Sequence, residues 1–184
     1  MVVLATTQVA AAQKTEIDVG GNIGLSLPTG DAADLYVPGW NAGGVFRIVP
    51  KNWPVGIQVD GVYSSYNRDA ANITDRGLTI LTGSVGVVYQ VELEQTSLEP
   101  YFIGGASVNR LSVKDPRTID NYGSSTNMGL ILGGGLAFKS EKSWFAPYLD
   151  FRVNGIFGSD PRQSSYININ LAFLVLLQGR HSAP

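Results

Sequence analysis

Hydrophobic and polar residues alternate along most of this chain with a period of two. In the last such run the odd positions from Ile167 to Leu177 are apolar, whereas the even positions begin with Tyr166, Asn168 and Asn170. Alternation of this kind predicts a β-strand with one apolar face and one polar face. The pattern predicts eight strands, at 15–27, 40–49, 55–66, 77–91, 100–111, 127–139, 145–157 and 165–177.

The connections between these strands alternate in length. Short connections are expected at 50–54, 92–99 and 140–144, and mostly longer, polar ones at 28–39, 67–76, 112–126 and 158–164. Barrels of outer membranes have short periplasmic turns and longer external loops. An even number of strands then puts both ends of the chain on the periplasmic side, in one domain without a linker.

The residue types on the polar face decide which face points outward. A soluble barrel would carry many Lys and Glu residues there, but the polar strand positions are mostly Ser, Asn, Gln and Gly. Charged residues make up 15% of the chain, against about 25% in a typical soluble domain. No apolar run approaches the roughly 20 residues of a membrane helix. We therefore expect an all-β, eight-stranded, antiparallel, up-and-down transmembrane β-barrel, in which only alternate residues must be apolar.

Charges of both signs occur inside the predicted strands. Because an unpaired buried charge is costly, they are expected to pair within a narrow lumen. Arg47 should contact Glu16 or Asp18, and Arg152 should contact Asp150 or Asp60. An eight-stranded barrel is only wide enough for side chains to fill it, so the lumen is expected to be plugged. The predicted lumen ion-pair network consists of Glu16, Asp18, Arg47, Asp60, Asp150 and Arg152.

The opposite alternation phase predicts the face that meets lipid. Six apolar residues that share this phase are Phe46, Ile57, Val87, Leu132, Phe151 and Phe173. Aromatic residues near both ends of the strands predict two belts at the membrane interfaces. The expected membrane-interface aromatics are Trp40, Trp53, Tyr89, Tyr101, Trp144 and Phe145.

Residues 1–13 resemble the second half of a secretory signal peptide, with an apolar stretch followed by Ala10, Ala11 and Ala12. The expected organisation is therefore a signal-peptide remnant at 1–13, the barrel at 14–178 and a short tail at 179–184. Cysteine is absent, which excludes disulfides and thiolate metal sites. The net charge of −2 gives no basic surface for nucleic acid.

Several segments resemble the small outer-membrane β-barrel superfamily that includes the OmpA transmembrane domain, OmpX and OmpW-like proteins. They are the strand openings from Glu99 and Ala146, the run that begins at Gly83, and the final alternating strand. The resemblance implies the outer membrane of a Gram-negative-type bacterium, contact with outer-membrane lipid, and help from the barrel-assembly machinery during insertion. Members usually end on an aromatic residue, whereas Gln178 to Pro184 follow the last alternating positions here.

Catalysis is not expected. Enzymes on small outer-membrane barrels resemble one another in needing a histidine as general base, and the single histidine, His181, follows the last predicted strand. The run from Gly133 to Ser140 lacks the glycine that a phosphate loop needs before its lysine, because Phe138 stands there. We therefore expect no catalytic residues, no metal ligands and no cofactor.

Three functions remain open. The first is an integral outer-membrane barrel with a structural or surface-contact role and a plugged polar lumen, whose loop partner the sequence does not identify. The second is a narrow pore or small-solute channel. The third is a soluble, lipocalin-like ligand-binding barrel.

Overall fold

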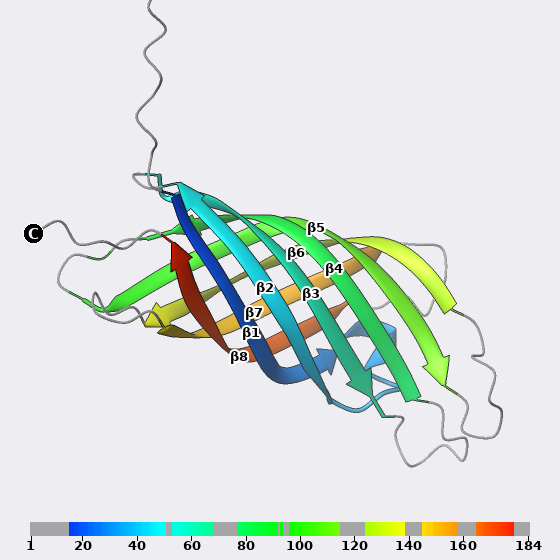
Figure 1. Cartoon of the computed structure of the whole chain (residues 1–184). Coiled ribbons are helices and arrows are strands. Elements are labelled where there is room, and N and C mark those ends of the chain that lie inside the picture. The colour runs from blue at the N-terminus through cyan, green and yellow to red at the C-terminus, as the bar shows by residue number, and fades with distance from the viewer. Residues whose placement is uncertain are drawn as a thin grey trace, which may run out of the picture.

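The computed structural model is a closed barrel of eight strands (Figure 1). It describes residues 15–50, 53–67, 77–91, 93, 96–114, 124–138, 145–157 and 165–178. The strands are β1 (Thr15–Pro28), β2 (Gly39–Pro50), β3 (Val55–Tyr66), β4 (Gly77–Gln90), β5 (Leu98–Lys114), β6 (Ser124–Phe138), β7 (Phe145–Phe157) and β8 (Tyr166–Gln178). A 3₁₀ turn, η1 (Gly30–Ala32), follows β1. All eight predicted strands are present, with bounds that differ by at most three residues.

Each strand pairs antiparallel with the next, and β8 pairs back with β1 to close the barrel. β1 therefore begins, and β8 ends, at the same end of the barrel (Figure 1), which we call the short-turn end. The opposite end is the long-loop end. No helix among the described residues is long and apolar enough to cross a membrane.

The strands are staggered around the barrel. Paired residues followed from Asp18 through Arg47 on β2 and onward to Tyr166 on β8 return to β1 at Pro28, ten residues farther along. A stagger of this kind tilts the strands, as barrel closure requires. It also places residues that are distant in the sequence at the same depth in the lumen.

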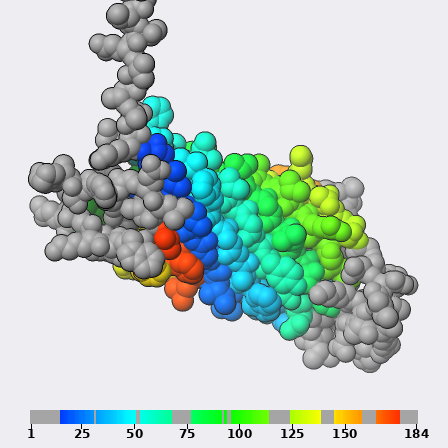
Figure 2. All heavy atoms as spheres, in the orientation of Figure 1, coloured from blue at the N-terminus to red at the C-terminus, as the bar shows by residue number. Residues whose placement is uncertain are grey.

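The outward face is apolar, as the alternation predicts. Side chains of neighbouring strands lie side by side over this surface (Figure 2). The six residues expected to face lipid are all exposed: Phe46, Ile57, Val87, Leu132, Phe151 and Phe173. Many of the inward positions carry polar side chains, including Arg47, Asp60 and Arg152, while large apolar side chains are exposed on the outside. That inversion suits a protein whose solvent is hydrocarbon.

The aromatic residues follow the strand phase rather than their distance from the turns. Trp40, Trp53, Tyr89 and Phe145 are exposed on the outside, but the prediction for Tyr101 was wrong, because its side chain is only 2% exposed. Tyr101 occupies an inward position of β5, between the outward residues Pro100 and Phe102. Tyr166, at the start of β8, is likewise buried in the lumen. Trp144 lies outside the described residues.

The lumen as the candidate functional site

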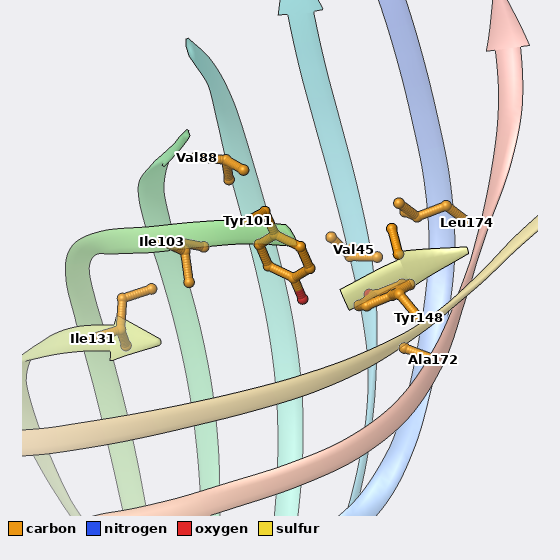
Figure 3. Packing of buried hydrophobic residues seen from close by; sticks show 9 residues of the cluster. Val45, Val88, Tyr101, Ile103, Ile131, Tyr148, Ala172 and Leu174 are labelled. Atoms are coloured by element: carbon orange, nitrogen blue, oxygen red, sulfur yellow. The ribbon is translucent and has the colours of Figure 1, made fainter. Parts of the chain in front are cut away.

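An apolar cluster fills the lumen toward the short-turn end. Figure 3 shows Tyr101 pointing from β5 into the interior near Val45, Val88 and Ile103. These residues occupy inward positions of their strands, so closure of the barrel brings their side chains into contact in the lumen. The cluster consists of Val45, Val88, Tyr101, Ile103, Ile131, Ala137, Tyr148, Ala172 and Leu174, with Ala146 packed against it.

Arg152 forms the centre of a charged layer beside this cluster. Its Nη1 lies 2.9 Å from Asp60 Oδ2, across the lumen on β3. Its Nε lies 2.8 Å from Asp150 Oδ1, two residues earlier on β7. Both carboxylates were predicted as alternatives for Arg152, and the structure brings both to the same guanidinium.

Arg47 is fully buried and reaches different partners from those predicted. Asp18 is its partner in strand register, but Nε of Arg47 donates to Gln58 Oε1 at 2.7 Å rather than to Asp18 or Glu16. The guanidinium carbon lies 4.8 Å from the centroid of the Tyr101 ring and 5.8 Å from that of Tyr148. Contact with two aromatic faces offsets part of the cost of burying the cation.

Hydrogen bonds join the two arginines through neutral groups. Gln58 Nε2 donates to Asp60 Oδ1 at 2.8 Å, and the Tyr101 hydroxyl donates to Asp150 Oδ2 at 2.5 Å. Together with the contacts above, these bonds close a loop around the lumen. We call this loop the charged ring: Arg47, Gln58, Asp60, Arg152, Asp150 and Tyr101.

The charged ring is balanced, since two arginines face two aspartates. Ser84 of β4 adds a hydrogen bond to Asp60 Oδ2 at 3.3 Å, and Asn170 of β8 adds one to Asp150 Oδ1 at 3.2 Å. The network therefore draws side chains from β2, β3, β4, β5, β7 and β8. Separating its charges in a low-dielectric interior would cost several kcal/mol.

Two glycines of β6 make room for the charged ring. A Cβ atom at Gly133 would come within 2.9 Å of Arg152 Cγ, and one at Gly135 would come within 2.7 Å of the Tyr101 hydroxyl. Both positions face inward beside β7. The glycine run that superficially resembles a phosphate loop is thus part of a strand that yields space to larger lumen side chains.

A neutral polar layer lies on the other side of the charged ring, and it falls into two groups. Ser26 Oγ donates to Asn168 Oδ1 at 2.5 Å and shares a hydrogen bond with the Tyr66 hydroxyl. Thr82 Oγ1 donates to Asn109 Oδ1 at 2.9 Å and lies 2.6 Å from the Tyr166 hydroxyl.

Sequence reasoning did not identify the neutral layer as a site. The alternation of β3 could have identified it, because Tyr66 has the same inward phase as Gln58 and Asp60.

The segment after β1 covers part of the lumen at the long-loop end. Tyr36 packs against a second apolar cluster, which contains Tyr66, Leu78, Ile80, Ile156 and Tyr166. Hydrogen bonds hold both ends of the segment to residues that adjoin the neighbouring strands β8 and β3. Thr29 N and Oγ1 donate to Ser165 O, at 2.9 and 2.6 Å, and Val37 N donates to Asn67 O at 3.0 Å.

The described residues offer little for catalysis or metal binding. No group of three or more His, Cys, Asp or Glu side chains among them is placed to hold a metal ion. His181 lies outside this part of the chain. The lumen carboxylates Asp60 and Asp150 are engaged with Arg152.

Comparison with known proteins gives structural matches only. No family model matches the chain, and no curated protein matches it in sequence.

Neisserial surface protein A matches with a TM-score of 0.63 and 18% identity, over 86% of this chain and 96% of that one. A major outer membrane protein from Thermus thermophilus matches with a TM-score of 0.61 and 15% identity, over 89% and 99%.

A third match is Ail, the attachment invasion locus protein of Yersinia pestis, in complex with the heparin analogue sucrose octasulfate. Its TM-score is 0.53, at 14% identity over 89% of this chain and 98% of that one. At these identities the likeness concerns the fold. The chain has the fold of the small outer-membrane β-barrels, and its apolar exterior suits the hydrocarbon of a membrane.

Proposed function

We propose that the protein is an integral outer-membrane barrel with a sealed lumen, which acts through contacts made by its external loops and not as a pore. The charged ring carries this proposal. It crosses the lumen between strands on opposite sides of the barrel, and its members are at most 4% exposed. A continuous water path would require its ion pairs to separate.

The layers on either side of the charged ring support the same conclusion. An apolar cluster fills the lumen toward the short-turn end, and Tyr36 packs on another at the long-loop end. A solute entering from either side would therefore meet bulky apolar side chains before it reached the charges. Passage would demand rearrangement of three layers rather than of one residue.

The contact role rests on the connections at the long-loop end. They are mostly longer than those at the opposite end, and acidic residues slightly outnumber basic ones in them. Among proteins of the same fold, one is a surface protein and another is an attachment invasion locus protein. The acidic balance of the connections here does not complement a polyanion such as the heparin analogue bound by the latter. The surface of a partner protein would complement these connections better than a polyanion would.

A narrow pore is the second candidate, and one observation favours it. Nη1 and Nη2 of Arg47 make no hydrogen bond within the described part of the chain. A buried guanidinium with unused donors gains from new partners, and Arg47 has two such nitrogens whereas Arg152 has one. A soluble ligand-binding barrel is disfavoured, because its faces would be inverted relative to those observed.

Planar-bilayer recordings of the refolded protein test the sealed lumen. We expect no sustained single-channel currents from the wild-type barrel. Arg152→Ala should open brief currents, because it removes the link between Asp60 and Asp150. Thr82→Val, which alters the neutral layer only, serves as the matched control and should remain silent. Sustained currents from the wild-type protein would replace the proposal with the pore.

The contact role is tested by shortening loops in cells that display the barrel. Replacing residues 115–123 with a four-residue Gly–Ser turn should reduce attachment to cultured epithelial cells if the β5–β6 connection makes the contact. Equivalent shortening of 30–35, 68–76 and 158–164 identifies the contribution of each remaining connection at the long-loop end. Thr82→Val again provides a control with intact loops. Attachment that survives all four replacements together would remove the contact role.

A further inference from the structure

Of the basic side chains that the structure describes, Arg47 and Arg152 lie in the lumen, whereas Arg110 is exposed. Arg110 occupies an outward position of β5, in the same phase as Phe102 and Val108, which are 61% and 49% exposed. It therefore extends from the outer wall of the barrel toward the surrounding membrane. Its place on the strand is near the long-loop end.

The residues beside Arg110 mark the edge of the apolar exterior. One step toward the middle of the membrane, Val108 pairs with the exposed residue Met128 of β6. At the level of Arg110, the β6 partner is the exposed hydroxyl residue Thr126, and the next pair outward is Ser112 with Ser124. On the β4 side Arg110 pairs with Leu81, an apolar residue that is 55% exposed. On the β6 side the wall changes from apolar to polar between Val108 and Arg110. That boundary is the depth at which lipid headgroups begin.

Arg110 has no carboxylate close to it on its own sheet. β4 and β6 contain no acidic residue, and the acidic residue of β5, Glu99, lies at the opposite end of that strand. An exposed guanidinium at a membrane boundary attracts an anion, and the anions at this depth are headgroup phosphates. Arginine binds phosphate through two parallel N–H groups, which suits it to this ligand better than a point charge.

Thr126 supplies a second donor on the same patch. Residues that face one another across an antiparallel pair hold their Cβ atoms about 4.5–5.5 Å apart. A phosphate bound by Arg110 would therefore lie within reach of the Thr126 hydroxyl. Other sectors of this rim are different, since Trp40 on β2 and Phe157 on β7 present exposed aromatic rings there.

We propose that Arg110, with Thr126, forms a binding site for the phosphate of an outer-leaflet lipid headgroup on the β5–β6 sector of the barrel. The long stem of Arg110 lies along the apolar wall while its guanidinium reaches the headgroup layer. This site lies outside the lumen, so it is independent of whether the barrel conducts. It places one bound lipid at the outer face of β5 and β6.

Native mass spectrometry of the barrel released from nanodiscs tests the site. The nanodiscs contain phosphatidylcholine and a minor fraction of phosphatidic acid, whose exposed phosphate monoester is the probe. The wild-type barrel should retain phosphatidic acid in preference to phosphatidylcholine. Arg110→Gln should lower this preference about fivefold, which corresponds to the roughly 1 kcal/mol of one basic residue near an anionic surface.

Three further variants separate the phosphate site from nonspecific effects. Arg110→Lys keeps the charge but loses the paired donors, so its preference should lie between those of wild type and Arg110→Gln. Thr126→Val should cause a smaller loss, and Ser65→Ala, a polar change on β3 in another sector, should cause none. Unchanged retention in Arg110→Gln would refute the site. Equal losses in Ser65→Ala would refute it as well.

Inorganic phosphate in solution distinguishes a lipid site from a site for free phosphate. Millimolar phosphate should leave the retention of phosphatidic acid by the wild-type barrel unchanged, because the membrane holds the lipid at the rim. Displacement by free phosphate would overturn the assignment to a lipid. If Arg110→Gln yields no folded barrel, the paired results for Arg110→Lys and Thr126→Val decide the outcome. If both variants then retained phosphatidic acid as well as the wild-type barrel does, the site would be refuted.

Discussion

Phe151 and Arg152 are neighbours on β7 and experience opposite environments. Phe151 is 47% exposed on the outer wall, whereas Arg152 is 4% exposed at the centre of the charged ring. In a soluble protein the aromatic residue would be buried and the arginine solvated. Each face of the barrel wall is therefore matched to a different solvent. The outer face is matched to hydrocarbon, and the inner face supplies its own polar partners.

The inner face should be the more sensitive of the two. Arg152→Ala leaves Asp60 and Asp150 as buried carboxylates without their cation, which should destabilise the barrel by about 3–5 kcal/mol. Urea unfolding in phospholipid vesicles, followed by tryptophan fluorescence, measures this change. The triple variant Arg152→Met, Asp60→Asn and Asp150→Asn removes all three charges together and should recover most of the loss. A triple variant less stable than Arg152→Ala would contradict this account of the ring.

On the outer face, Phe151→Arg should cost about 2–4 kcal/mol, because it places a cation among acyl chains near the membrane midplane. The same unfolding assay measures the effect. Phe151→Leu is the matched control and should remain within about 1.5 kcal/mol of wild type, as volume-conserving apolar exchanges do. Wild-type stability in Phe151→Arg would mean that this surface does not face hydrocarbon.

Tyr101→Phe tests a single neutral member of the charged ring. It deletes the hydroxyl that donates to Asp150 but keeps the ring beside Arg47, so the expected loss is about 1.5–3 kcal/mol, the usual range for hydrogen bonds to charged groups. Tyr89→Phe, on the outer wall of the adjacent strand, should change stability by a few tenths of a kcal/mol at most. Equal effects of the two substitutions would show that Asp150 does not depend on Tyr101.

The smallest effect is expected in the neutral layer. Thr82→Val removes a hydroxyl that bonds Asn109 and Tyr166, and these two groups retain a hydrogen bond to each other at 3.1 Å. The loss should therefore be about 0.5–1.5 kcal/mol. The unfolding midpoint in vesicles reports it. A loss as large as that of Arg152→Ala would erase the distinction between the charged and neutral layers.

The alternation of residues predicted the strands and their faces well, because the period of two is imposed by backbone geometry. It underestimated β5 and β6, which extend to Lys114 and begin at Ser124. Pairing continues through Ser112 and Ser124, but outward positions beyond the membrane no longer need to be apolar. The hydrophobic signal therefore ended before the strands did.

Contacts across the lumen were harder to predict than faces. Both partners of Arg152 were named correctly, since Asp150 shares its strand face and Asp60 is the acidic inward residue of β3. Arg47 was assigned to the carboxylates of β1, whereas it bonds Gln58, its register partner on β3, and lies over two tyrosine rings. Such neighbours depend on the stagger of the strands, which alternation within one strand does not encode. Tyr101 was misplaced because proximity to a turn was given more weight than phase.

The charged ring also constrains the order of events during folding. Its members come from β2, β3, β5 and β7, and the bond between Tyr101 and Asp150 alone joins residues 49 positions apart in the chain. The ion pair of Arg152 with Asp60 on β3 cannot form until the strands curve far enough for opposite walls to meet. Until then Asp60 lacks its cation, whereas Arg152 can already pair with Asp150 on its own strand. The contact between Arg152 and Asp60 is therefore gained only as the barrel closes, and closure must remove the water that solvates Asp60 before it.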